Sequence, residues 1–353
     1  MNNFDNYIPI GDKGSRRFLN SENLIICYIY TMESMEKLAQ ITTSEQAPSP
    51  YTLQIEEFLG ETKELFSPEE IEILAQEVAV FETKLITERG DFERAIFYNK
   101  HTKTFSEGTN VLTKGQIVSS RHFQGRLSLP KSQDTSFEEK KLTKTYHEGL
   151  VADFVFSKTN KILAEKLAEI FQMKNTDKAE AYEAIARREE VGSEQLGVVA
   201  EKLMIGLAEC IAIDRPDLKI KVLPANAYED VENKIDFIIE TTQKKRGAGI
   251  ETKDLEPEHK SVGIQFTINT NKKSFKEGQI SKAKERGVHV DDIVYVDIDM
   301  NILLEAMKKW EKSGKPISGP WNYLPKETKI GAIKGLFHSV LTTEQEESLI
   351  KGI

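Results

Sequence analysis

Cysteine and histidine are scarce in this chain and lack the spacings of common metal sites. The cysteines, Cys27 and Cys210, lie far apart among 353 residues, and six histidines are scattered along the sequence. Neither a Cys-x-x-Cys pair nor a His-Glu-x-x-His pattern is present, which argues against a disulfide framework and against the usual zinc motifs. The pattern favours two structural thiols in a reducing, cytoplasmic compartment.

Long hydrophobic runs are also missing near the start of the sequence. The apolar run Leu24–Tyr30 is far too short to span a bilayer, and no small-residue cleavage site follows it. We therefore expect no membrane association. The run is interpreted as a short strand or as an upstream-extended start, with Met32 or Met35 as the true initiator.

The chain also lacks an excess of positive charge. Lys and Arg number 48 against 57 Asp and Glu, which gives a net charge of −9. A chain this acidic is not a general coat for polyanions, so any nucleic acid must contact a local basic patch. Hydrophobic residues make up 39% and charged residues 30%, as expected for a globular chain of two or three domains.

Composition and turn signals predict four regions. Residues 32–50 are polar and end in Ala47-Pro48-Ser49-Pro50, which is typical of a linker. The predicted regions are a flexible or extended segment (1–50), an accessory helical and mixed α/β region (51–190), a core domain (191–314) and a C-terminal extension with a short helix (315–353).

The accessory region contains one strong helix start. Ser67 precedes Pro68, and Glu70 is placed to complete a capping box, so a helix is predicted from there to about Ile86. Beyond it, the local pattern predicts short strands at 95–98 and 116–119, a charged loop at 131–146 and helix over 150–190.

The core domain gives the clearest pattern. Ser274 and Glu277 predict a capping box at the start of a helix, and Gly287 predicts its end. Apolar periodicity predicts helices at 194–212, 274–286 and 301–312, and strands at 220–223, 234–242, 261–269 and 293–298.

The element order of this domain is therefore α-β-β-β-α-β. Three successive strands predict hairpins, the β-α-β ending predicts one parallel crossover, and the apolar strands predict helices on both faces of the sheet. Over about residues 193–312 this order resembles the core of the PD-(D/E)XK nuclease-like (restriction endonuclease-like) superfamily. The resemblance implies an α+β or α/β fold with a mixed sheet flanked by helices, beside an N-terminal helical and mixed α/β region.

The polar landmarks of that superfamily have counterparts here. Asp236, within the second strand, matches the family's first acidic position, and Gln265 on the third strand matches the second. Glu201 on the preceding helix matches an acidic residue found in some members. The resemblance implies Mg²⁺, or Mn²⁺, bound by oxygen ligands. The implied ligands are Asp236, Gln265, Glu201 and, on the same strand face as Asp236, Glu240.

One position departs from the family pattern. Thr267 stands where the family has a catalytic lysine, and Thr cannot replace a cation. Some members take this lysine from the following helix, where Lys276 and Lys282 are the candidates and spacing does not choose between them. The site is thus either a variant nuclease or a relic. For Asp236 the structural alternative is a lysine partner or a backbone turn, because a carboxylate among apolar neighbours needs compensation.

A local basic patch follows the third strand. Residues 271–287 hold six basic and two acidic side chains. The functional interpretation is contact with DNA phosphates, and the alternative is the solvated face of a surface helix. Candidate contacts are Lys244, Lys245, Arg246, Lys272, Lys273 and Lys284.

Two functions are consistent with these features, and both leave a homo-oligomer open. The first is a metal-dependent DNA endonuclease that hydrolyses phosphodiester bonds. The alternative is a catalytically inactive nuclease-fold protein that binds nucleic acid or a protein partner.

Overall fold

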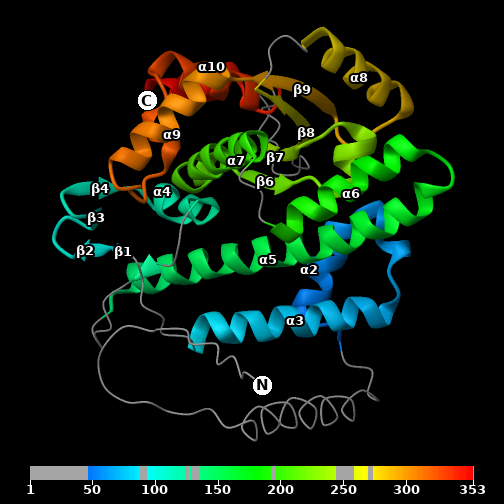
Figure 1. The fold of residues 1–353 in the computed structure, drawn as a ribbon. Helices are drawn as coiled ribbons and strands as arrows, with labels where there is room; N and C mark the ends of the chain where they lie inside the picture. Colours follow the sequence, from blue (N-terminus) through cyan, green and yellow to red (C-terminus); the bar gives the residue numbers. More distant parts are fainter. Residues whose placement is uncertain are drawn as a thin grey trace, which may run out of the picture. The chain divides into compact units, whose positions relative to one another are not determined.

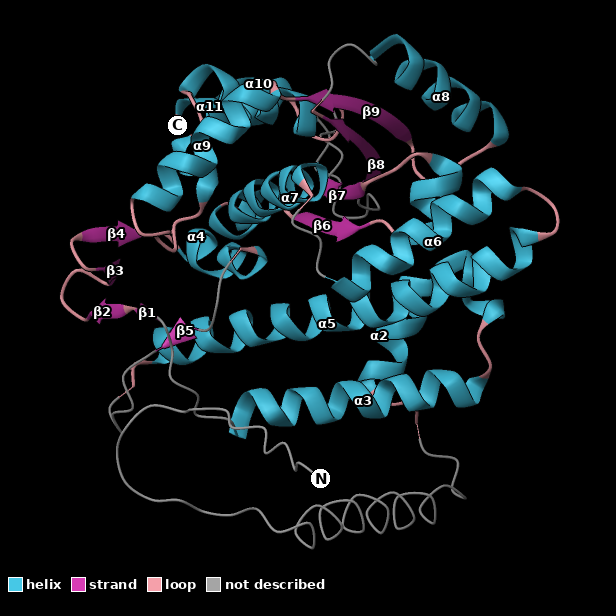
Figure 2. Ribbon diagram, in the orientation of Figure 1, coloured by secondary structure: helices cyan, strands magenta, loops and turns pink. Residues whose placement is uncertain are grey.

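The computed structural model shows a mixed α+β protein (Figures 1 and 2). The chain divides into two compact units, 1–48 and 49–353, and every element below belongs to the second. The run Leu24–Tyr30 and Cys27 lie outside the described residues. None of the helices in the described residues is long and apolar enough to cross a membrane. The structure describes residues 47–87, 94–123, 127–128, 135–191, 195–243, 258–268 and 273–352.

The first helices are α2 (Pro50–Leu59), the 3₁₀ turn η1 (Gly60–Leu65) and α3 (Pro68–Thr87). The predicted capping box at the start of α3 is confirmed. The Glu70 amide donates to the Ser67 hydroxyl at 3.2 Å, and the Ser67 amide donates to the Glu70 carboxylate at 2.8 Å. Local sequence therefore sets the start of this helix.

Short strands follow. β1 (Arg94–Ala95) pairs in parallel with β5 (Leu127–Ser128), while β2 (Phe97–Asn99), β3 (Thr104–Glu107) and β4 (Asn110–Leu112) form an antiparallel sheet. The strand predicted at 95–98 is confirmed in position as β1 and β2.

The strand predicted at 116–119 is wrong, because this segment forms helix α4 (Lys114–Ser119). Thr113 caps the helix in a capping box with Gln116. The Asp214 carboxylate then accepts from the Thr113 hydroxyl at 2.6 Å and from the Gly115 amide at 2.9 Å. These contacts outweigh the strand propensity of Ile117 and Val118.

Gly115 lies against the last turn of α7 (Leu196–Asp214), which leads to a first prediction. A Cβ added at Gly115 would lie 2.2 Å from the Cys210 carbonyl oxygen, which is backbone and can move only with α7. We expect Gly115→Ala to lower the free energy of unfolding by about 1–3 kcal/mol. Urea denaturation measures this change.

Gly331 provides the matched control, because a Cβ there meets no atom within 4 Å. Gly331→Ala on a helix surface should raise stability by about 0.5–1 kcal/mol. Equal responses of the two variants would contradict the close approach of α4 to α7.

A long helix, α5 (Phe137–Gln172), and α6 (Thr176–Val191) form a hairpin (Figure 2). The loop predicted over 131–146 is wrong from residue 137 onward. Ser136 caps α5 in a capping box with Glu139, and Leu142 and Tyr146 are buried. Leu142 and Tyr146 lie four residues apart on one helix face, but the charged residues around them favoured the prediction of a loop.

The C-terminal half forms one four-stranded sheet (Figure 1), in the order β6-β7-β8-β9. β6 and β7 are antiparallel, as are β7 and β8, while β8 and β9 are parallel. The predicted hairpins and the single crossover are thus confirmed. After α7 the elements are β6 (Ile220–Pro224), the π-helical turn η4 (Glu229–Asn233), β7 (Phe237–Gln243), β8 (Glu258–Thr267), α8 (Lys273–Arg286), β9 (Asp292–Asp297) and α9 (Met300–Lys312).

Helices cover both faces of this sheet, as predicted. On one face α7 and α9 pack on strand residues such as Phe237 and Ile264. On the other face Ile280 and Ala283 of α8 pack on Ile235. Gly287, with φ +82°, ends α8 as expected.

The C-terminal region is more than the predicted extension with a short helix. It forms two helices, α10 (Lys326–Phe337) and α11 (Thr343–Lys351). Trp321, Leu336 and Phe337 are buried in the same core as α7. Residues after 315 therefore complete the domain that was predicted to end at 314.

Candidate functional site

Asp236 lies directly before β7 and is fixed to the neighbouring strand β8. Its amide donates to the Ile264 carbonyl at 2.8 Å, and its carboxylate accepts from the Phe266 amide at 2.5 Å. These two bonds flank Gln265. The carboxylate is therefore held at the start of β7, against the β8 backbone next to Gln265.

Gln265 is 1% exposed, and its amide faces two neighbours of different kind. When the amide is oriented so that both of its atoms have partners, its oxygen accepts from the Lys276 ammonium at 3.0 Å and its nitrogen donates to the Lys234 carbonyl at 3.1 Å. This orientation satisfies both groups. The structure thus brings the strand amide together with Lys276 of α8, one of the two predicted lysines. The other, Lys282, is exposed elsewhere on the helix.

Glu201 of α7 approaches the same place from the opposite helix layer. Its carboxylate lies 3.8 Å from the Arg188 guanidinium of α6. Burial raises the pKa of Glu201 to about 8, with Asp236 and Asp230 adding to the shift and Arg188 opposing it. The negative charge of Asp236 therefore makes ionisation of Glu201 less favourable.

Asp230, in η4, belongs to this carboxylate cluster as well. Burial raises the pKa of Asp236 to about 7, and the next contribution in the same direction comes from Asp230, against the Phe266 amide, Lys276 and Arg188. Burial also raises the pKa of Asp230 itself. The sequence signal for this residue was its place in the short acidic segment just before Asp236, which was interpreted mainly as a solvated loop.

These raised pKa values predict how stability depends on pH without metal. A folded pKa above the unfolded value means that the folded state holds the extra proton, so stability falls as pH rises from about 4 towards 7. Asp236→Asn cannot ionise and should be about 2 kcal/mol more stable than the parent chain at pH 8. Denaturation in EDTA at pH 4, 6 and 8 measures the difference, which should vanish at pH 4. A less stable variant at pH 8 would show that the ionised carboxylate is fully compensated.

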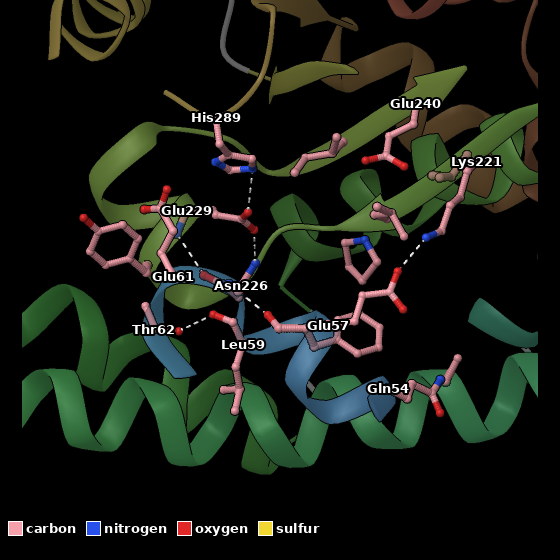
Figure 3. A pocket seen from close by; sticks show the side chains of 18 of the residues that line it. Gln54, Glu57, Leu59, Glu61, Thr62, Lys221, Asn226, Glu229, Glu240 and His289 are labelled. Carbon is pink, nitrogen blue, oxygen red and sulfur yellow. Dashed lines mark hydrogen bonds and ion pairs between the residues drawn. The ribbon is translucent and has the colours of Figure 1, made fainter. Parts of the chain in front are cut away.

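Glu240 does not join the cluster, and its role as a predicted ligand is wrong in position. Glu240 lies four positions after Asp236, which along an extended chain is about 13 Å. Glu240 instead lines a cavity of about 640 Å³ between η1, α5, β6 and β7, where Figure 3 shows it beside Lys221. Its carboxylate lies 3.8 Å from the imidazole of His259.

The predicted DNA-contacting residues divide into two groups. Lys273 lies 5.9 Å from the centre of the Tyr295 ring, and Lys284 is paired with Asp292 at 2.5 Å. The charge of Lys284 is therefore compensated within the chain. Lys244, Lys245, Arg246 and Lys272 lie outside the described residues.

The oxygen atoms of the cluster are of the chemical type that binds hard cations. Asp236, Asp230 and Glu201 offer carboxylate oxygens, which Mg²⁺ and Mn²⁺ prefer. Within the described part of the chain, no three His, Cys, Asp or Glu side chains converge on one metal position. The Arg188 guanidinium lies 3.8 Å from Glu201, so a cation of the protein already lies beside this carboxylate.

No family model, curated protein or solved structure matches this chain. Topology and site geometry alone therefore support a functional interpretation.

Proposed function

We propose that this chain is a metal-dependent phosphodiester hydrolase of the PD-(D/E)XK type that acts on DNA. The observation that carries the proposal is the 3.0 Å contact between Lys276 and the Gln265 amide, beside Asp236. In the family the catalytic lysine comes from the third strand, at the position where this chain has Thr267. Lys276 of the helix would take the place of that strand lysine. The order β6-β7-β8-β9, with α7 and α8 on opposite faces, supports a nuclease-like core.

Each side chain has a role in this proposal. Asp236 and the Gln265 amide oxygen, with Glu201 as a second carboxylate, would hold Mg²⁺ or Mn²⁺ together with waters and the substrate phosphate. The metal, when bound, polarises a phosphoryl oxygen and lowers the pKa of water. Lys276 stabilises negative charge that develops on the phosphate oxygens.

The backbone bonds of Asp236 keep its carboxylate in place before substrate arrives. Its amide is bonded to Ile264 and its carboxylate to Phe266, so both ends of the residue are tied to β8. A ligand held in this way needs little reorganisation when the phosphate binds. Exposed Lys282 on the same helix as Lys276 gives a DNA backbone a cationic contact near the site.

A cytoplasmic location is part of the proposal. Cys210 is buried, and burial raises the pKa of its thiol, with Asp214 adding to the shift. A thiol of this kind is structural rather than reactive.

The second candidate is a nuclease-fold protein that binds nucleic acid or a protein partner without cleavage. Arg188 and Lys276 lie among the acidic residues of the cluster, and this observation favours the alternative. Side chains that compensate one another in this way could persist in a relic.

A cleavage assay separates the two functions. Plasmid and linear duplex DNA are incubated with the full chain and Mg²⁺ or Mn²⁺, or with EDTA. We expect cleavage only with metal, and loss of cleavage in Asp236→Asn with the fold retained by circular dichroism. Glu240→Gln is the matched control, because Glu240 lies away from the cluster and should keep activity. Intact DNA together with retained DNA binding would favour the second candidate.

A further inference from the structure

The cavity of about 640 Å³ shown in Figure 3 is distinct from the candidate nuclease site. Its walls come from α2, η1 and α5 of the accessory region and from β6, β7 and η4 of the core domain. Asp236, Gln265 and Lys276 are not among its lining residues. Its volume falls within the range of about 300–1,000 Å³ that is typical of pockets for small molecules. The cavity is therefore a candidate site for a separate ligand.

Part of the cavity lining is apolar. Phe58 of α2 and Val222, Leu223 and Pro224 of β6 are half-buried there. An apolar group that covers such side chains removes hydrophobic surface from water, which is favourable by about 25 cal/mol per Å². A ligand of this cavity should therefore carry a hydrocarbon part.

The charged part of the lining is mainly acidic. Six carboxylate side chains line the cavity, against one arginine, one lysine and one histidine. The Arg121 guanidinium is already bonded to Glu209 at 2.5 and 2.8 Å and to Asp153 at 2.9 Å. The Lys221 ammonium lies 2.7 Å from Glu57 (Figure 3). Both permanent cations of the lining are therefore paired with three of the six carboxylates.

The other three carboxylates lie on three different elements. Glu61 is an exposed residue of η1, and it has no ion pair within the described ranges of the chain. Glu229 lies in η4, where its nearest cationic group is His289 at 3.1 Å. Glu240 of β7 lies 3.8 Å from His259. Negative charge in the cavity is thus balanced only by imidazoles, which are cationic only when protonated.

Glu229 is held in place by its own turn. Its carboxylate accepts from the Asn226 amide at 2.8 Å, while the Asn226 side-chain oxygen accepts from the Glu229 amide at 3.0 Å. Asn226 is 8% exposed, and its side-chain nitrogen donates to the Phe58 carbonyl at 3.1 Å. The turn is thereby joined to α2, so the Glu229 carboxylate is positioned before any ligand arrives.

The response of His289 shows that this part of the cavity favours a cation. The bond to Glu229 raises the pKa of His289, burial opposes the shift, and the charges of Glu61 and Glu240 add to it. Carboxylates of η1, η4 and β7 therefore all stabilise positive charge at one position of the lining.

The spread of the carboxylates indicates what kind of cation fits. Within the part of the chain that the structure describes, no three His, Cys, Asp or Glu side chains form a group that could hold a metal ion. Separate carboxylates suit a ligand with several cationic groups better than they suit one ion. An ammonium group donates up to three hydrogen bonds, and methylene groups between ammonium groups would cover the apolar lining.

We propose that this cavity binds a small aliphatic polyamine, whose ammonium groups pair with Glu229 and Glu61 and whose methylene chain lies on the apolar lining. The proposal does not depend on the nuclease function, because the two sites share no lining residue.

Isothermal titration calorimetry of the full chain with spermidine, at low salt and without DNA or metal, tests the proposal. We expect one saturable site. Glu229→Gln keeps an acceptor for Asn226 but loses the charge, so Kd should rise about tenfold or more. Glu61→Gln, at an exposed position, should raise Kd about twofold to fivefold.

Glu56→Gln is the matched control. Glu56 lies on α2 beside Glu57, is exposed and does not line the cavity, so Kd should stay within about twofold. Equal losses from Glu56→Gln and Glu229→Gln would show that spermidine responds only to the net charge of the chain, and the site would be rejected. The same conclusion follows if spermidine does not bind to the parent chain.

Lys221→Met gives an expectation of opposite sign and does not depend on Glu229. Lys221 is an exposed cation of the lining, and its removal leaves Glu57 free to pair with the ligand. Kd for spermidine should fall about twofold to fivefold. If Glu229→Gln does not fold, an unchanged or higher Kd in a folded Lys221→Met variant would still overturn the proposal.

Competing ligands test the chemical class. 1,8-Octanediol has a similar length but no ammonium group, and it should not displace spermidine. Mg²⁺ at matched ionic strength should not displace it either. Displacement by Mg²⁺ would reject the polyamine in favour of a metal ion, and tighter binding of a trilysine peptide than of spermidine would reject it in favour of a basic peptide.

Discussion

Lys276→Met is expected to lower the rate of metal-dependent DNA cleavage about 100- to 1000-fold, the range found when one preorganised donor at a developing negative charge is removed. Lys276 is the lysine whose ammonium lies 3.0 Å from the Gln265 amide. Met keeps the length of the aliphatic chain but removes both the charge and the donor to Gln265, which should also cost about 1–3 kcal/mol of stability. The cleavage rate is therefore compared at a temperature where circular dichroism shows that the variant is folded.

Lys282→Met is the matched control, since Lys282 lies on the same helix and is exposed. It should weaken DNA binding slightly at low salt and leave the single-turnover rate nearly unchanged. Single-turnover cleavage of plasmid DNA measures the rate, and fluorescence anisotropy measures binding separately. Equal losses of rate in the two variants would assign both lysines to phosphate binding. They would contradict the proposal that Lys276 replaces the catalytic lysine of the strand.

Much of the core domain could be predicted because its signals are local. The strands of β6 to β9 have long apolar runs, and Gly287 marks the end of α8. The first turns of α5 were missed because their charged composition is typical of a loop, although Ser136 and Glu139 form a local capping box. α4 was missed for a different reason, because it depends on a partner distant in sequence, the Asp214 carboxylate that holds Gly115 across 99 residues. Propensity within a short window carries no information about such a partner.

At the candidate site, too, some residues could be predicted from local sequence and others depend on distant parts of the chain. Asp236 and Gln265 were predicted because they match two polar positions of the family pattern, although β7 begins only at Phe237. The choice between Lys276 and Lys282 depends on how α8 lies across the sheet, and spacing alone does not give that. Arg188 had no sequence signal at all, since it comes from another region of the chain.

Glu240 illustrates the limit of strand periodicity. Alternation predicts that residues 236, 238 and 240 share one side of a strand, but β7 begins only at Phe237, and alternation says nothing of distance along the strand. A residue on the correct face can therefore lie far from the site, as Glu240 does near His259. The face on which a side chain lies identifies a ligand only together with its position along the strand.

Arg121→Met is expected to lower the free energy of unfolding by about 3 kcal/mol, because it takes the guanidinium from Glu209, whose side chain is 15% exposed and keeps only His122 as a partner. Arg121, in the turn η2 (Ser120–His122), has a side chain that is 8% exposed. It donates to both oxygens of Glu209 on α7, at 2.5 and 2.8 Å, and to Asp153 on α5 at 2.9 Å. The guanidinium thereby joins the accessory helices to the core domain.

Arg215 provides a matched control on the surface. It also makes two bonds to one carboxylate, at 2.8 and 2.9 Å to Asp217, but that carboxylate is 59% exposed. Arg215→Met should therefore change stability by only about 0–1 kcal/mol. Comparable losses from Arg121→Met and Arg215→Met in urea denaturation would show that burial of the Arg121 network contributes little.

The pH dependence of the Arg121→Met loss identifies its cause. Burial alone would raise the pKa of Glu209, but His122 and Arg121 together lower it to about 2. A folded pKa below the unfolded value of about 4.3 stabilises the chain above that pH, and the contribution is lost as pH falls towards 2. The difference in stability between Arg121→Met and the parent chain should therefore be largest near neutral pH and should shrink below about pH 4. A difference that stays constant down to pH 3 would assign the loss to packing of the arginine side chain over α5 rather than to its charge.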